Sequence, residues 1–293
     1  MKFECAGKLI LLGEYSVITG GPALVAAIPP FFSVTVSGGV KGVVHPFHKD
    51  SPAGLLVSDF TKKYSDLSCK LEWSDPYKTP IGVGSSSAQF VLVYRALCAK
   101  LKIPEPSTEK LLLKYWAIVG STQGIRPSGV DVVSQFMGGV TYFRNEPFLA
   151  EKIRLPSWDA EFILAFTGSK MKTHEHLMKL QARGFPGAFQ NMLSRLNDLT
   201  ARGLDAWKAS DAEAFGRCMG FYQDAMNTEN LSDEPVIEKI TRGRHMAGVL
   251  GCKGSGAQGG DSALFLVEKN RVASVSEEIK KQLGWEVFNV SLS

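Results

Sequence analysis

Two glycines, Gly82 and Gly84, stand directly before three serines, Ser85, Ser86 and Ser87, in the stretch PIGVGSSSAQFVLVYRAL. A glycine-rich turn that leads into a helix exposes backbone N–H groups that lack a partner, and these groups together with the helix dipole favour a bound anion. The serine hydroxyls at such a place could bind phosphate oxygens or a Mg²⁺ ion. A serine N-cap after an ordinary loop is the alternative interpretation.

Two further stretches combine glycines with charged residues. The C-terminal stretch CKGSGAQGGDSALFLV has four glycines before an expected strand, which suits close approach of the backbone to phosphates. The N-terminal stretch GKLILLGEYSVITGGPAL has Lys8 and Glu14 in an apolar setting. The chain has no G-x-x-x-x-G-K-[ST] motif, so it is not predicted to be a P-loop protein.

A serine nucleophile is the competing chemistry for the serine-rich turn. The letters GSSSA come close to the G-x-S-x-G motif, which requires an apolar strand immediately before it. The preceding residues, SDPYKTPIGV, do not form a core strand. The sequence therefore disfavours a serine hydrolase.

Size and composition exclude several classes of protein. The 293 residues suffice for one large domain or two ordinary ones, and the net charge of +4 suits an anionic small-molecule ligand without indicating nucleic acid. Five scattered cysteines without a C-x-x-C pair indicate reduced thiols. No signal-peptide core and no run of 18 apolar residues is present. We expect a cytoplasmic protein that binds neither nucleic acid nor a membrane.

Strand and helix patterns alternate along both halves of the chain. Apolar runs predict strands near residues 8–12, 23–28 and 31–36, with Pro29 and Pro30 ending the second of them. Helical spacing starts at Ser86. The remaining expected elements are helices at 107–119, 173–181, 188–199, 212–226, 235–247 and 273–283, and strands at 140–143, 161–166, 262–267 and 285–290. This mixture predicts an α+β fold with two lobes, residues 1–152 and 153–293.

In this order, the three glycine-containing stretches resemble the three signature motifs of the GHMP kinases. Two further stretches, KYWAIVGSTQGIRPSGVDVVSQFMGG and FTGSKMKTHEHL, resemble the mevalonate kinase and phosphomevalonate kinase branch of that family. The resemblance covers most of the chain. It implies an N-terminal lobe like ribosomal protein S5 domain 2 and a ferredoxin-like C-terminal lobe.

The resemblance implies an ATP-dependent kinase that transfers the γ-phosphate to a small alcohol, with ATP and Mg²⁺ as cofactors. Mevalonate, a precursor in isoprenoid synthesis, is the favoured acceptor. The letters GEY and GGD look more like phosphomevalonate kinase and leave 5-phosphomevalonate as the alternative. A diphosphomevalonate decarboxylase and a non-catalytic ligand-binding protein of the same fold are further alternatives. The protein is expected to be a monomer or a homodimer.

Matching the motifs residue by residue implies specific roles. Asp131 matches the catalytic aspartate, which accepts or orients the proton of the attacking hydroxyl, and Lys8 matches the lysine beside it. Without the resemblance, Asp131 would be interpreted as a turn cap and Lys8 as a solvated residue. The expected ATP-binding residues are Gly82, Gly84, Ser85, Ser86, Ser87, Gly256 and Ala257, with Ser86 also the expected metal ligand.

A third group of residues is expected to contact the substrate. Its members are Glu14, Tyr15, Arg126, Ser128, Lys170, Lys172 and Thr173. Solvated surface charge is the alternative for the three basic residues, a helix N-cap for the threonine, and an anchor of the first loop for the glutamate. The sequence departs from mevalonate kinases in VGSTQGIRP, which lacks their Mg²⁺-binding glutamate. Either Ser86, ATP oxygens and water hold the metal, or the glutamate is replaced by Gln123 or by an acid from elsewhere in the chain.

Overall fold

The apolar patterns correspond to most of the helices and strands of the computed structural model, which describes residues 1–77, 81–123, 126–168, 187–228, 234–256 and 262–292. The strands are β1 (Lys2–Leu12), β2 (Ala23–Ser37), β3 (Val43–Val44), β4 (Cys69–Ser74), β5 (Val140–Arg144), β6 (Leu149–Ile153), β7 (Ala160–Phe166), β8 (Val249–Ser255), β9 (Ser262–Glu268) and β10 (Glu286–Val290). The α-helices are α1 (Pro52–Lys63), α2 (Ser85–Leu101), α3 (Thr108–Gln123), α4 (Val130–Met137), α6 (Gly187–Lys208), α7 (Ala212–Asn227), α8 (Glu234–Arg244) and α9 (Val272–Glu278). Shorter turns of helix are η1 (Ser16–Thr19), η3 (Lys269–Arg271) and η4 (Ile279–Leu283).

These elements form two compact units, each made from two stretches of the chain. Residues 1–8 and 26–141 form the first unit, and residues 9–25 and 142–293 form the second. The boundaries between the units fall inside β1, β2 and β5 rather than in loops. The predicted division of the chain between residues 152 and 153 stays a prediction.

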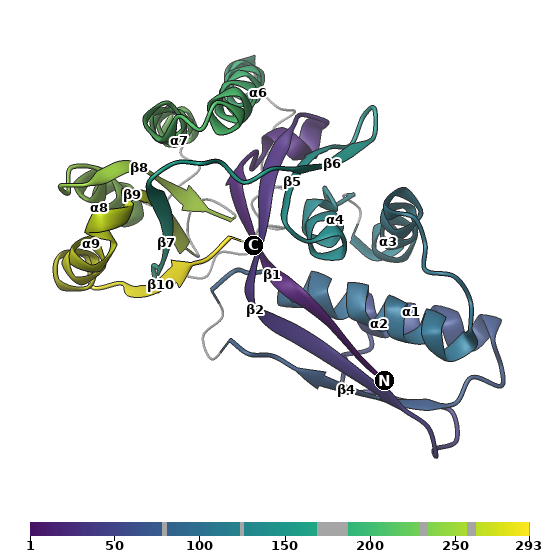
Figure 1. The fold of residues 1–293 in the computed structure, drawn as a ribbon. Helices are drawn as coiled ribbons and strands as arrows, with labels where there is room; N and C mark the ends of the chain where they lie inside the picture. The colour runs from purple at the N-terminus through teal and green to yellow at the C-terminus, as the bar shows by residue number, and fades with distance from the viewer. Residues whose placement is uncertain (78–80, 124–125, 169–186, 229–233, 257–261, 293) are drawn as a thin grey trace. The chain divides into compact units, whose positions relative to one another are not determined.

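The first unit packs helices beside a twisted sheet. Strand β2 pairs with β4 in antiparallel register, with Ser33 opposite Ser74, and β1 also pairs with β2. Phe32, Val34 and Val36 alternate along β2 and are buried, as period-2 patterning requires. Helix α2 packs against both α1 and α4, and α1 and α2 run alongside each other in Figure 1.

The expected strand break at Pro29 and Pro30 is wrong. Strand β2 continues through both prolines to Ser37. Pro29, Pro30 and Phe31 are exposed, whereas the residues before them, from Ala23 to Ile28, are buried. Because the two missing N–H groups fall on the exposed part of the strand, no buried hydrogen bond depends on them.

The second unit contains a four-stranded antiparallel sheet with strand order β10-β7-β9-β8. Its four strands therefore lie in the order fourth, first, third, second, which is that of a ferredoxin-like sheet. Helices α8 and α9 cover one face, where Ile240 and Val275 share a buried core with Phe265. Helices α6 and α7 cover the other face, where the Phe162 ring contacts the aromatic rings of both helices (Figure 1).

Several other boundaries differ from the sequence-based expectations. Helix α3 extends to Gln123, beyond the expected helix end at residue 119. The first residues of the glycine-rich C-terminal stretch lie in a strand that was not expected, because β8 continues through Ser255. Strand β6 crosses the expected lobe boundary between residues 152 and 153. The helix expected at residues 173–181 lies outside the described residues.

The described helices include none that combines the length and the hydrophobicity needed to cross a lipid bilayer. The five cysteines are all buried and unpaired, as expected for reduced thiols.

Burial makes the thiols poor nucleophiles, which predicts slow labelling of the folded protein. It raises the pKa of Cys5 and of Cys252 to about 12 and that of Cys98 to about 11. At pH 8 the thiolate fraction of the first two is about three orders of magnitude below that of a free cysteine. We expect a thiol-reactive disulfide reagent to label all five cysteines quickly in urea and these two slowly without it. Labelling of Cys5 or Cys252 at the rate of a free thiol in the folded protein would contradict this.

Candidate active site

A buried lysine and a partly open aspartate form an ion pair in the first unit. Lys8 lies on β1, and its Nζ is 3.2 Å from Oδ1 of Asp131. The Lys8 side chain is 9% exposed and that of Asp131 is 36% exposed. Lys8 is therefore not the solvated residue that its sequence context alone suggested. Because the carboxylate is partly exposed, it can receive a proton from a ligand while it remains paired with the buried ammonium.

Local structure explains the position of Asp131. The residue lies in the first turn of α4, where the helix dipole stabilises a negative charge. Gly129 caps this helix with φ of 74°, and a Cβ there would lie 2.1 Å from Cδ1 of Leu112. Only glycine suits both this backbone conformation and the close approach to α3. Burial, and then the charge of Asp131, raise the pKa of Tyr115, so this hydroxyl stays protonated at neutral pH.

The serine-rich turn becomes the first turn of α2. Gly84 caps the helix with φ of 83°, and Lys8 donates its backbone N–H to the Val83 carbonyl at 2.9 Å. This bond joins β1 to the turn. The Ser86 side chain is exposed, whereas Ser87 is buried and donates to the Gly84 carbonyl at 2.9 Å.

The other predicted residues of this turn differ in their surroundings. The Ser85 hydroxyl donates to Asp75 Oδ2 at 3.0 Å, and Gly82 is exposed with φ of 76°. The first-turn N–H groups of α2 and the exposed Ser86 hydroxyl together form a site of the kind that binds an anion.

A second, deeply buried ion pair lies in the second unit. Oε1 of Glu14 is 2.5 Å from Nζ of Lys253, and the two side chains are 4% and 0% exposed. Lys253 also donates to the Gly254 carbonyl at 2.8 Å, and the Tyr222 hydroxyl donates to the backbone carbonyl of Glu14 at 2.7 Å. This geometry fits the alternative role of Glu14, an anchor of the first loop. Tyr15, which follows it, is buried with φ of 61°.

The beginning of the third glycine-rich stretch is held by buried side chains. Oε1 of Gln223 accepts a hydrogen bond from the Gly254 N–H at 2.6 Å, and Lys253 holds the carbonyl of the same residue. Gly256, predicted to bind ATP, has φ of 89° at the end of this described segment, and Ala257 lies outside the described residues. Sequence reasoning missed Lys253 and Gln223. The available signal for Lys253 was a charged residue inside an otherwise small and apolar strand.

No model of a known protein family matches the chain. The mevalonate kinase of Aeropyrum pernix is 28% identical to this chain in an alignment that covers 98% of this chain and 94% of that protein. The structure of L. major mevalonate kinase in complex with R-mevalonate has a TM-score of 0.77 at 20% identity and covers 100% and 96% of the two chains. Streptococcus pneumoniae phosphomevalonate kinase in complex with phosphomevalonate and AMPPNP has a TM-score of 0.82 at 16% identity and covers 99% of both.

Over nearly its whole length, the chain is therefore similar to GHMP kinases. The predicted α+β fold of this family is confirmed.

The remaining residues predicted to bind the substrate are only partly described. The Arg126 guanidinium lies over the Trp116 ring, 4.2 Å from its centroid, and Trp116 donates to the Pro127 carbonyl at 2.7 Å. The Ser128 hydroxyl accepts a hydrogen bond from the Val130 N–H at 3.5 Å. These contacts place Arg126 and Ser128 beside the start of α4. Lys170, Lys172 and Thr173 lie outside the described residues, as does the side chain of Gln123.

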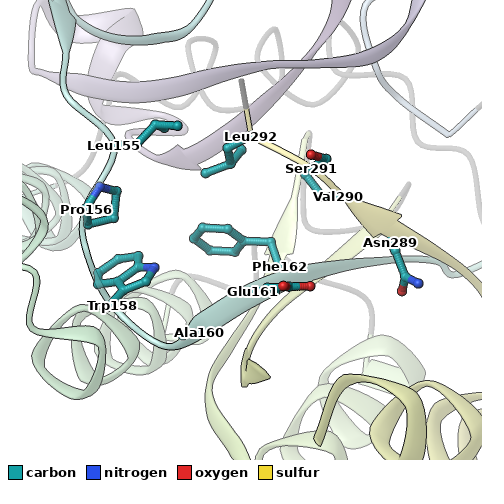
Figure 2. A pocket seen from close by; sticks show the side chains of 10 residues that line it. All are labelled: Leu155, Pro156, Trp158, Ala160, Glu161, Phe162, Asn289, Val290, Ser291 and Leu292. Atoms are coloured by element: carbon teal, nitrogen blue, oxygen red, sulfur yellow. The ribbon is translucent and has the colours of Figure 1, made fainter. Parts of the chain in front are cut away.

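A pocket in the second unit does not suit a nucleotide. It has a volume of about 300 Å³, and Figure 2 shows apolar side chains, including Leu155, Phe162 and Leu292, along its wall. Among the residues that the structure describes, its lining contains the acidic Glu161 but no lysine, arginine or histidine. Phosphates would find no cation here. The anion site at the start of α2 is the better candidate.

Replacing Gly84 with alanine is predicted to impair nucleotide binding. A Cβ at this position would lie 2.8 Å from Cγ of Lys8 and would force a positive φ on an L-residue. Strain of about 1–3 kcal/mol is expected, and the turn or Lys8 must move to relieve the collision. We expect Gly84→Ala to raise the Kd for ATP at least about tenfold, measured by calorimetry.

Gly39 offers a matched control for this substitution. Its φ is 90°, but no atom lies within 4 Å of the place that a Cβ would occupy, so Gly39→Ala adds backbone strain without a collision. The control should lose stability and keep its ATP affinity. Equal ATP affinities for the two variants would refute the proposed role of the turn.

Proposed function

We propose that this protein is a GHMP kinase that transfers the γ-phosphate of ATP to the hydroxyl of mevalonate. The observation that carries the proposal is the Lys8–Asp131 ion pair, joined through the Val83 hydrogen bond to a helix start that suits phosphates. Full-length similarity to a mevalonate kinase supports the choice of acceptor. Phosphoryl transfer depends mainly on positioning and on neutralisation of charge, which these groups could supply.

Each group has a defined role in the proposed reaction. Asp131 accepts the proton of the attacking hydroxyl, because its carboxylate is partly open while Lys8 remains behind it. The Lys8 ammonium offsets negative charge that develops in the transition state. Backbone N–H groups in the first turn of α2 bind phosphate oxygens.

The residues present also fit a Mg²⁺ ion that enters with ATP. Ser86 offers an exposed hydroxyl oxygen at the start of α2, and hydroxyl oxygen is a suitable ligand for Mg²⁺. Among the described residues, no cluster of three or more acidic, histidine or cysteine side chains could hold a metal alone. This agrees with the usual binding of Mg²⁺ through one or two protein groups together with phosphates and water. When bound, the ion neutralises charge on the transferred phosphate.

5-Phosphomevalonate is the second candidate acceptor. The GEY and GGD sequences favour it, as does the lack of the glutamate expected before Asp131 in a mevalonate kinase. Its acceptor group is a phosphate, which is already ionised at neutral pH and needs no general base. The dependence of the rate on Asp131 therefore distinguishes the two chemistries.

A coupled assay of ADP release tests the proposal. Mevalonate, 5-phosphomevalonate, diphosphomevalonate, homoserine and galactose are compared at equal concentration, and CO₂ release is followed with diphosphomevalonate. We expect the highest kcat/KM with mevalonate. Preference for 5-phosphomevalonate would change the acceptor, and CO₂ release would indicate a decarboxylase. Tight ATP binding without turnover of any acceptor would indicate a ligand-binding protein.

A further inference from the structure

A buried glutamine links the three chain segments that form the candidate site of the first unit. Gln135 lies on α4, one helical turn after Asp131, and is 3% exposed. Its Nε2 is 3.2 Å from the carbonyl of Ala6 on β1 and 3.1 Å from that of Gly84. A third carbonyl, that of Val83, lies at 3.5 Å. Because the amide has two N–H hydrogens, the two shorter contacts account for its donors.

The oxygen of the same amide indicates why a glutamine is present. Oε1 of Gln135 is buried and has no hydrogen-bond partner among the described residues. A buried acceptor without a partner is unfavourable, and an apolar side chain of similar size would avoid this cost. Stability alone therefore does not explain why an amide is present. The two N–H donors, which have acceptors at hydrogen-bond distance, do explain it.

The hydrogen bond from Gln135 to the Gly84 carbonyl fixes the orientation of the peptide group that begins α2. The Gly84 carbonyl also accepts from the Ser87 hydroxyl and from the Ala88 N–H, both at 2.9 Å. In a trans peptide the C=O and N–H groups point in opposite directions. A carbonyl held by Gln135 therefore directs the Ser85 N–H away from α4 and toward the mouth of the helix.

We infer that Gln135 is a positioning residue for phosphoryl transfer, which rests on the proposed function. It holds the first phosphate-binding N–H of α2 in a fixed orientation relative to Asp131. It also fixes the part of β1 that leads to Lys8, since Ala6 lies two residues before that lysine. The proton acceptor, the ammonium and the phosphate site are thus held in register by one side chain.

The test compares Gln135→Met, which keeps the length but removes the donors, with Gln135→Asn, which keeps the donors on a shorter side chain. With mevalonate, we expect Gln135→Met to lower kcat/KM for ATP between about 10-fold and 100-fold, because small misplacement of reacting groups has effects of this size. The KM for mevalonate should change less than twofold. Gln135→Asn should give an intermediate loss.

Val36→Ala is the control for lost stability. Val36 is buried in the same unit and bonds to Met1, roughly 23 Å along β1 from Lys8. Each variant is assayed at a temperature the same number of degrees below its own Tm, so that the two are compared at similar stability. The kcat/KM of Val36→Ala for ATP should equal the wild-type value. Equal losses in the two variants, or a wild-type rate for Gln135→Met, would overturn the inference.

Hydrogen exchange separates this inference from the proposed function. In Gln135→Met, backbone amides of residues 83–88 should exchange at least about tenfold faster than in Val36→Ala, because their anchoring bonds are lost. This measurement needs no turnover. A wild-type protein inactive with every acceptor would refute the proposed function, and unchanged exchange at residues 83–88 would refute the role of Gln135. If Gln135→Met does not fold, Gln135→Asn provides the same comparison.

Discussion

Replacing Asp131 with asparagine is expected to lower kcat with mevalonate by about two to four orders of magnitude, the usual contribution of a general base. Asparagine keeps the shape of the side chain but cannot accept the hydroxyl proton. The affinity for ATP should remain near that of the wild type, because nucleotide binding is assigned to the start of α2. Steady-state kinetics measures the first quantity and calorimetry the second.

Asp59 provides the matched control for this prediction. It forms an ion pair with Lys114 at 2.6 Å in the same unit, and its side chain is 38% exposed, close to the 36% of Asp131. Asp59→Asn should leave kcat within about twofold of the wild type, since partly exposed pairs contribute little. A normal kcat for Asp131→Asn would remove this residue from the mechanism, and with 5-phosphomevalonate as the acceptor the loss should be much smaller.

Replacing Lys253 with methionine is expected to lower the free energy of unfolding by about 3–5 kcal/mol, because it leaves the buried carboxylate of Glu14 without its cation. The pair has a 2.5 Å contact, and both side chains are nearly inaccessible to water. Oε2 of Glu14 already has no hydrogen-bond partner among the described residues, so no described group there could replace the lysine. Urea denaturation followed by fluorescence measures the change.

A double variant tests the cause of this loss. Combining Lys253→Met with Glu14→Gln removes both charges and should recover at least half of the lost stability, because the cost of an unpaired buried charge disappears. The control is Lys70→Met, which breaks an exposed 2.6 Å pair with Glu72 and should change stability by less than about 1 kcal/mol. An effect of Lys253→Met as small as that of the control would show that the buried pair contributes little.

The sequence predicted features that depend on local patterns. The change to helical spacing placed the start of α2 within one residue, because two glycines and a run of apolar residues define it. Other local signals were present but not used. Ser51 accepts a hydrogen bond from the Gly54 N–H at 3.1 Å, and Pro52 begins α1, so a serine followed by proline could have predicted this helix.

Features that depend on contacts distant in sequence could not be predicted in this way. Lys8 is buried beside its partner Asp131, which lies more than a hundred residues later in the chain. The residues next to Lys8 in the sequence therefore give no sign of its burial. Gln135 has no distinguishing local pattern, and its importance follows from carbonyls on two other segments. The motif resemblance supplied the roles of Lys8 and Asp131. Without it, the first would have been interpreted as a solvated residue and the second as a turn cap.

The composition of the two compact units limits how such chains can recombine. The second unit needs residues 9–25 as well as residues 142–293, and the partners Glu14 and Lys253 come from these two distant stretches. A chimaera that joins the C-terminal half of this chain to a foreign N-terminal half would inherit the lysine from one parent and its counter-charge from the other. A crossover between Glu14 and Lys253 is therefore expected to give a stable protein only when both parents have this acid–lysine pair.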